Sequence, residues 1–248
     1  MVVSALRRPS DQFDNSIIPK RWSLENFTDV FQPGTGFGRA LLNSLIVAGT
    51  VTILTLIVGM VAAYTLARLD FKFKNLVLAI IITTSMFPGI SLVIPLKKLF
   101  SDIEWINTYQ AMIVPSLSFA LPLAVWNLTA FFRQMPRELE QAAMVDGCTP
   151  AQAFRKVIIP LAAPGVFTTA IITFIAAWNE FLIAVSMVNR KDISTANVLI
   201  ASFTGTSGRD QPFGSQMAAG VVVTIPLVIA VLIFQRRIVA GLTAGGVK

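Results

Sequence analysis

The sequence contains no histidine and a single cysteine, Cys148. Without histidine the chain cannot form a serine–histidine catalytic pair or an HExxH metal site. Without a second cysteine it cannot form an internal disulfide, so cysteine usage says nothing more about its compartment. The sequence also lacks the GxxxxGK[ST] phosphate-binding loop, so the chain cannot hydrolyse ATP by itself.

Charged residues are scarce and segregated. They make up 13% of the chain, about half of the share that is typical of soluble domains, whereas hydrophobic residues make up 54%. A single soluble core could not bury that many apolar side chains. Residues 157–189 contain only one charged residue, Glu180. Four stretches contain no Asp, Glu, Lys or Arg at all: residues 40–67, 75–96, 105–132 and 211–235.

These stretches predict an all-α, polytopic membrane protein. A membrane helix needs about 20 mostly apolar residues, and backbone groups in lipid must bond within their own segment, which favours helices. We expect Pro88-Gly89 to interrupt the second span and Pro95 to end it. Prolines inside the third and last spans are typical of helices that face protein or a water-filled path. The five expected spans are residues 41–67, 76–96, 110–132, a segment within 165–188, and 217–234.

Basic residues lie next to the expected spans. The formal net charge of +7 comes from Lys and Arg residues in short connections. We therefore expect these residues to contact anionic lipid headgroups, and not nucleic acid. Arg68, Arg133 and Arg236-Arg237 directly follow spans. Because basic residues at span ends mark the cytoplasmic side of a membrane, this placement predicts that the connections 68–74 and 133–164 lie in the cytoplasm.

The first 39 residues are mixed polar and contain three prolines. We expect them to form an ordered, extracytoplasmic segment that does not span the membrane. Within it, Trp22–Phe27 can begin a short amphipathic helix that Ser23 caps.

The connection 133–165 predicts two helices separated by a turn. Proline followed by acidic residues favours a helix start, and both occur in Pro136–Glu140. Gly147 can supply the left-handed conformation that ends a helix. The residues Thr149–Gln152 then fit a capping box with proline at the first helical position.

Several segments together resemble one family of membrane proteins. Gln141–Thr149, followed by Phe154–Leu161, resembles the EAA loop of bacterial ABC-importer permeases. The resemblance implies that this loop couples to an ATP-binding subunit, so residues 133–165 are named the coupling loop. Trp178–Phe181 resembles a motif in the penultimate span of carbohydrate permeases of the maltose MalG type, and Leu24–Phe27 and Asn43-Ser44 resemble that family's entry to a span. Three other segments are similar to the family's trehalose permeases: Ala153–Pro164, Ser202–Gly205 and Phe234–Thr243.

This resemblance implies a type I ABC-importer transmembrane domain over residues 40–248, in the cell membrane. It implies no catalytic residue and no cofactor in the chain itself; ATP and magnesium would be bound by partner subunits. The implied partners are two ATP-binding subunits, a second and non-identical permease subunit, an extracytoplasmic substrate-binding protein or lipoprotein, and a sugar such as trehalose. The residues implied to couple to an ATP-binding subunit are Glu140, Gln141, Ala142, Ala143, Asp146, Gly147, Thr149, Pro150 and Phe154. Those implied to meet the binding protein are Thr204, Gly205, Ser207 and Gly208.

The sequence departs from the family pattern in three places. Gln141 stands where the loop motif usually has Glu, and Cys148 stands where a small residue is usual. Glu140 is adjacent but points about 100° around the helix. The family usually has six spans and five are visible, so we expect residues 1–39 to include a remnant of the first span and the native protein to start upstream.

Other interpretations remain open at this stage. Glu180 is a candidate for a substrate path because intramembrane carboxylates are costly, but a structural hydrogen bond to a neighbouring helix is the favoured alternative. Asn179, Met86, Phe87 and Trp126 are further path candidates, with packing as their alternative role. A self-contained secondary carrier or channel is the alternative function, although such carriers often show repeated halves and several buried charges. An intramembrane hydrolase is disfavoured because one cysteine and one membrane glutamate are not a catalytic set.

Overall fold

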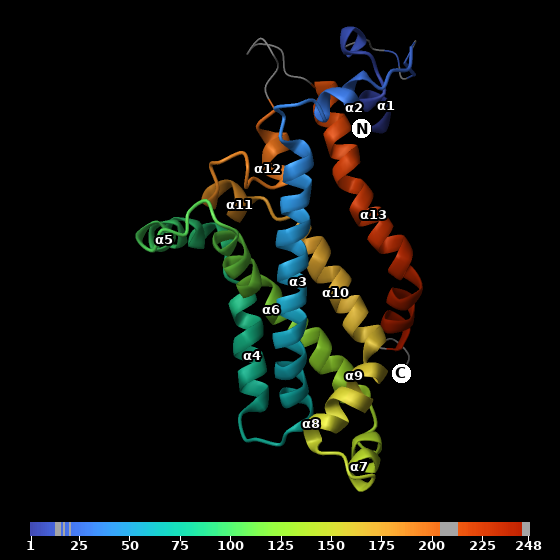
Figure 1. Cartoon of the computed structure of the whole chain (residues 1–248). Helices are drawn as coiled ribbons and strands as arrows, with labels where there is room; N and C mark the ends of the chain where they lie inside the picture. The colour runs from blue at the N-terminus through green and yellow to red at the C-terminus, as the bar shows by residue number, and fades with distance from the viewer. Residues whose placement is uncertain (13–15, 17, 20, 204–212, 245–248) are drawn as a thin grey trace. The chain divides into compact units, whose positions relative to one another are not determined.

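The computed structural model describes the chain except residues 13–15, 17, 20, 204–212 and 245–248, and for residues 234–244 it describes the backbone only. In the described residues the chain is helical, with one isolated β-bridge between Arg7 and Trp22. This confirms the all-α class. The helices, in chain order (Figure 1), are α1 Val2–Ala5, η1 Pro9–Asp11, α2 Glu25–Val30, α3 Phe37–Arg68, α4 Lys74–Ser85, α5 Gly89–Asp102, α6 Tyr109–Gln134, α7 Glu138–Val145, α8 Pro150–Ala153, the π-helix η2 Phe154–Ile158, α9 Ile159–Leu161, α10 Ala163–Trp178, α11 Leu182–Met187, α12 Ala196–Ala201 and α13 Phe213–Ala244.

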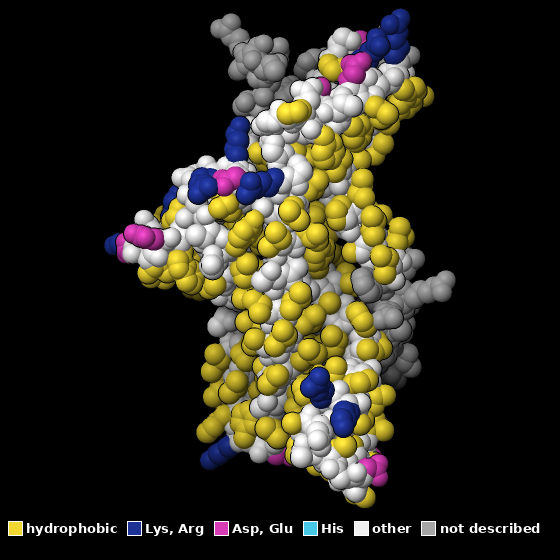
Figure 2. Space-filling view, viewed as in Figure 1, with side chains coloured by type: hydrophobic (Ala, Val, Ile, Leu, Met, Phe, Trp, Pro, Cys, Tyr) yellow, Lys and Arg dark blue, Asp and Glu magenta, His cyan; other side chains and the backbone are white. Residues whose placement is uncertain are grey.

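Three of these helices are long and apolar enough to cross a membrane: α3, α6 and the part of α13 over Phe213–Ile233. Two bent pairs pass the same test, α4 with α5 at an angle of 85° and Pro150–Leu161 with α10 at 74°. With each bent pair taken as one span, the described residues contain up to five spans. Figure 2 shows hydrophobic side chains over the long helices, and charged ones gathered at loops and helix ends.

Two expected boundaries differ from the structure. Pro95 does not end the second span, because α5 continues through it to Asp102. A proline has no N–H to donate, and its ring crowds the carbonyl of the preceding turn. Where neighbouring groups adjust to the freed carbonyl, the helix bends at the proline and continues. The fourth segment is not one helix either, because α10 ends at Trp178 and α11 begins at Leu182. The interruption at Pro88-Gly89 is confirmed.

The chain divides into two compact units, and the first contains the N-terminal segment. In this unit the buried Asn26 side chain of α2 donates hydrogen bonds to the carbonyl oxygens of Ala5, at 2.9 Å, and Arg7, at 2.6 Å. The expected cap at Ser23 is wrong: α2 begins at Glu25, its N-cap is Leu24 without a side-chain capping bond, and the Ser23 hydroxyl only accepts a bond from the Glu25 N–H. Unit 1 comprises Met1–Ala48, Leu92–Ile113 and Trp178–Ala230.

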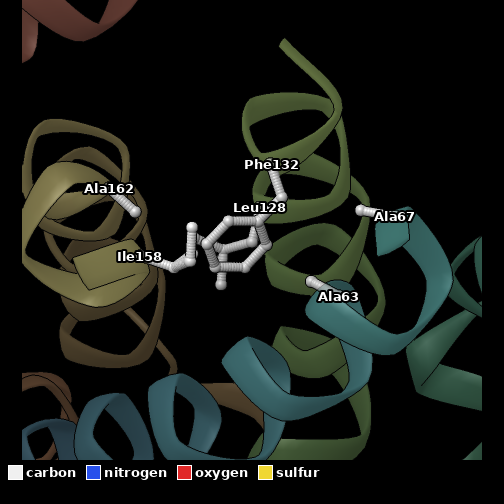
Figure 3. Packing of buried hydrophobic residues seen from close by; sticks show 6 residues of the cluster. All are labelled: Ala63, Ala67, Leu128, Phe132, Ile158 and Ala162. Atoms are coloured by element: carbon white, nitrogen blue, oxygen red, sulfur yellow. The ribbon is translucent and has the colours of Figure 1, made fainter. Parts of the chain in front are cut away.

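The second unit holds a core that fixes the coupling loop to two long helices. Its core side chains point toward one another from α3, α6 and the segment before α10 (Figure 3): Ala63, Ala67, Leu128, Phe132, Ile158 and Ala162. The approach is close at Gly165, where an added Cβ would lie 2.5 Å from the Phe131 ring. Unit 2 comprises Gly49–Ser91, Val114–Ala177 and Val231–Lys248.

Candidate functional site: the coupling loop

The coupling loop folds as its sequence predicts, as a helix, a glycine turn and a second helix. α7 ends in a Schellman motif, in which the Cys148 N–H bonds the Ala143 carbonyl at 3.0 Å and the Gly147 N–H bonds the Met144 carbonyl at 3.1 Å. This turn places Gly147 at φ +88°, a conformation that favours glycine.

The second helix begins with the predicted capping box. The Thr149 hydroxyl accepts a bond from the Gln152 N–H, and the Gln152 side chain accepts one from the Thr149 N–H. Pro150 occupies the first helical position, where its missing N–H is of no consequence. The helix then passes through the π-helix η2 and bends into α10. Figure 1 shows α7 and α8 beside one another, beyond the C-terminal end of α3.

One face of α7 is turned toward the rest of unit 2. Ala143 is buried, and Glu140, three residues earlier on the same face, accepts a hydrogen bond from the Tyr64 hydroxyl. The Glu140 carboxylate also lies 3.6 Å from the Arg68 Nε atom, and the two side chains are 15% and 5% exposed. The Phe154 ring packs on the Tyr64 ring with 4.4 Å between centroids. Both arms of the helix–turn–helix therefore contact Tyr64.

A second, exposed link joins the same elements. The Asp70 carboxylate lies 2.7 Å from the Lys74 Nζ atom and 3.4 Å from an Arg137 guanidinium nitrogen, just before α7. The hydrogen bond from Lys74, followed by its charge and the contact with Arg137, lowers the pKa of Asp70 below its usual value. Because Asp70 and Arg137 are largely open to solvent and Lys74 is only partly buried, this link is weak.

The remaining faces of α7 are open. Val145 is 87% exposed, and Leu139 and Met144 are exposed as well. Gln141, Ala142, Asp146 and Gly147 are also exposed. A short helix that presents large apolar side chains to the outside is a candidate contact surface. The residues grouped from sequence as one docking set are thus divided between two faces, with Glu140 and Ala143 on the inner one.

The candidate path residues do not form one cluster within a unit. Met86, 78% exposed, and Phe87 lie in the break between α4 and α5, and Trp126 lies on α6, all in unit 2. Asn179 and Glu180 lie in unit 1, between α10 and α11. The Glu180 carboxylate accepts hydrogen bonds from the N–H groups of Ile183, at 2.7 Å, and Ala184, at 3.1 Å, and so caps α11.

Unit 1 also contains a hydrogen-bonded clamp whose members sequence reasoning did not assign to a site. The Asn43 amide donates to the backbone carbonyls of Asp192, at 3.0 Å, and Ser194, at 2.9 Å, and accepts from the Tyr109 hydroxyl at 2.7 Å. The Ser44 hydroxyl accepts from the first N–H of α12. Thr204, Gly205, Ser207 and Gly208, the expected contacts of a binding protein, lie outside the described residues.

Comparison with known proteins decides the family. Residues 55–243 match the family described as "binding-protein-dependent transport system inner membrane component". The chain belongs to this family. The permease is therefore a multi-pass protein of the cell membrane, and the family that the resemblance indicated is confirmed.

Individual relatives match the permease over nearly its whole length. It is 47% identical over 244 residues to the trehalose transport system permease protein SugB of Mycobacterium tuberculosis, covering 98% of this chain and 89% of the relative. It is 41% identical to the trehalose/maltose transport system permease protein MalG of Thermococcus litoralis, covering 100% and 89%.

Solved structures support the fold of the permease. A bacterial ABC transporter involved in the import of the acidic polysaccharide alginate matches with a TM-score of 0.79 at 17% identity, over 95% of this chain and 87% of that one. The MetNI methionine ABC transporter matches with a TM-score of 0.64 at 21% identity, over 83% and 95%.

Proposed function

We propose that this chain is the permease subunit of an ATP-driven, binding-protein-dependent importer of a sugar, a disaccharide such as trehalose. The observation that carries the proposal is the coupling loop, in which a short helix exposes Leu139, Met144 and Val145 while its inner face is fastened to the end of α3. The trehalose and trehalose/maltose permeases that the chain resembles supply the sugar class.

In this proposal the exposed faces of α7 dock into an ATP-binding subunit. The apolar side chains contribute contact area, and the Schellman turn at Gly147 together with the capping box keeps the two arms in fixed relation. Asp146, exposed at the end of α7, can supply a charged contact in place of the missing one at Gln141. ATP-driven closure of two such subunits, which hold the ATP and magnesium, would move α7 and with it the helices to which it is fastened.

In the same proposal this chain forms half of the translocation path for the sugar, and a second, non-identical permease forms the other half. Met86, Phe87 and Trp126 are exposed, and aromatic faces stack on sugar rings. The bonds that Glu180 makes to α11 support a structural role for that carboxylate, with Asn179 beside it as the remaining polar candidate. Residues 204–208, through Thr204, Gly205, Ser207 and Gly208, would meet the extracytoplasmic binding protein.

The test has a biochemical and a transport arm. The tagged chain is purified in mild detergent from its native source, and co-purifying subunits and bound sugar are identified. With native Cys148 replaced by serine, Val145→Cys is then tested for cross-linking to a co-purifying ATP-binding subunit, with Cys placed at the core residue Ala63 as the negative control. We expect cross-linking from position 145 alone, and ATP-dependent sugar uptake in proteoliposomes. Uptake that persists without ATP and collapses with an ion gradient would establish the carrier alternative instead.

A further inference from the structure

The end of α3 and the inner face of α7 meet through three side chains, Tyr64, Arg68 and Glu140, which we call the inner anchor. Tyr64 and Arg68 are four residues apart, so they present their side chains on the same face of α3. Glu140 lies in the first turn of α7 and contacts both of them.

Charge makes this contact specific. In the described part of the chain the Arg68 Nε and Nη2 atoms are buried without a hydrogen-bond partner, and the Glu140 carboxylate, 3.6 Å from Nε, is the opposite charge that faces them. Removing one partner of a buried ion pair leaves the other uncompensated, which costs more than the pair contributes. The position of α7 is therefore sensitive to the charge on Glu140.

The other polar contacts of α7 do not duplicate the inner anchor. Glu138 occupies the same first turn but is exposed. The Asp70–Arg137 link is exposed on both sides, and such pairs contribute little. Tyr64 adds a contact with the second arm, since its ring packs on Phe154. In the described residues the inner anchor thus joins α3 to α7 through buried polar groups and to the second arm through a ring contact.

We propose that the inner anchor consists of positioning residues that transmit the movement of α7 to α3, so that each ATP hydrolysed moves the membrane helices. This inference rests on the proposed function. When the inner anchor is broken, α7 remains docked on the ATP-binding subunit through its outer face, but its displacement no longer moves α3 to the same extent. The expected defect is hydrolysis without transport.

The assembled transporter, purified with its partner subunits and placed in proteoliposomes, tests this idea. We measure sugar imported per ATP hydrolysed for the wild type, Glu140→Gln, Tyr64→Phe and the matched control Glu104→Gln, which changes an exposed glutamate outside the coupling loop. Glu140→Gln should lower this ratio roughly tenfold, as expected for the loss of a buried charge partner, while ATP hydrolysis continues. Tyr64→Phe should lower it less, because only a hydroxyl is lost, and Glu104→Gln should match the wild type.

A charge reversal separates positioning from a merely structural role. The double variant Arg68→Glu with Glu140→Arg should recover part of the ratio that Glu140→Gln loses. A wild-type ratio in Glu140→Gln would overturn the inference while leaving the proposed function intact, whereas a wild-type protein without ATP-dependent uptake would remove the proposed function itself. If Glu140→Gln and the reversal fail to assemble, Tyr64→Phe decides: an unchanged ratio overturns the inference and a lowered one supports it.

Discussion

Helix α3 fastens a connecting segment near its start and another at its end, and it does so by different chemistry. In unit 1, Asn43 and Ser44 bond to the backbone of residues 192–196 with neutral groups. In unit 2, the Tyr64 hydroxyl donates a hydrogen bond to the Glu140 carboxylate and Arg68 forms an ion pair with it. Neutral bonds to backbone fix the path of an irregular stretch whatever its side chains are. A charged pair between side chains instead holds an already folded helix, and its failure leaves a buried charge.

The largest effect is expected from breaking the charged attachment. Arg68→Met should lower the free energy of unfolding by about 3 kcal/mol, because the Glu140 carboxylate is left buried without its partner. SDS titration of the purified protein in mixed micelles, followed by circular dichroism, measures the change. Arg137→Met, which removes a partner of the exposed pair, is the control and should cost less than about 1 kcal/mol. Equal effects in the two variants would show that burial does not distinguish these pairs.

Breaking the neutral attachment should have the next largest effect. Asn43→Ala removes two donors and one acceptor, which leaves the carbonyls of Asp192 and Ser194 without this partner and should cost about 2 kcal/mol. Hydrogen exchange over residues 192–199 reports the local loosening. Asn43→Asp keeps the acceptor for Tyr109 and loses the donors, so it should loosen the same segment. Unchanged exchange in both variants would mean that the clamp does not hold this segment.

A third variant separates the shape of the coupling loop from its attachment. Gly147→Val forces a β-branched residue to φ +88°, at a cost of about 1–3 kcal/mol. Because the inner anchor is untouched, we expect the complex to remain in the membrane while ATP-driven uptake falls. Gly147→Asn is the matched control, since asparagine tolerates positive φ. Normal uptake with valine would show that the turn geometry is not required.

The sequence predicted local structure well and long-range attachment poorly. Gly147 and the box at Thr149–Gln152 depend on neighbouring residues, so their pattern suffices to predict the turn and the helix start. Asn43 reaches residues some 150 positions away, and no local pattern encodes that pairing. Glu140 was grouped with docking residues because the motif places it on α7, whereas the buried Arg68 of another helix decides which way it faces. One sequence signal could have indicated the inner face of α7: Glu140 lies three positions before the small Ala143, on the same side of the helix, and Arg68 is a basic residue that could pair with it.

The smallest effect is expected at the exposed link, and it depends on pH. Contacts with Lys74 and then Arg137 depress the pKa of Asp70 in the folded protein. Its contribution to stability is therefore fully present above the ordinary aspartate value of 3.8 and is lost as the pH falls through the lowered folded value. Asp70→Asn should be slightly less stable than the wild type at pH 7, by less than either attachment variant, and the difference should disappear as the pH is lowered below the ordinary value. Added salt should also reduce the difference at pH 7, because both partners are open to solvent. A difference that persists undiminished in acid and in salt would place Asp70 among the buried attachments, and the contrast between the exposed and buried pairs would then have to be abandoned.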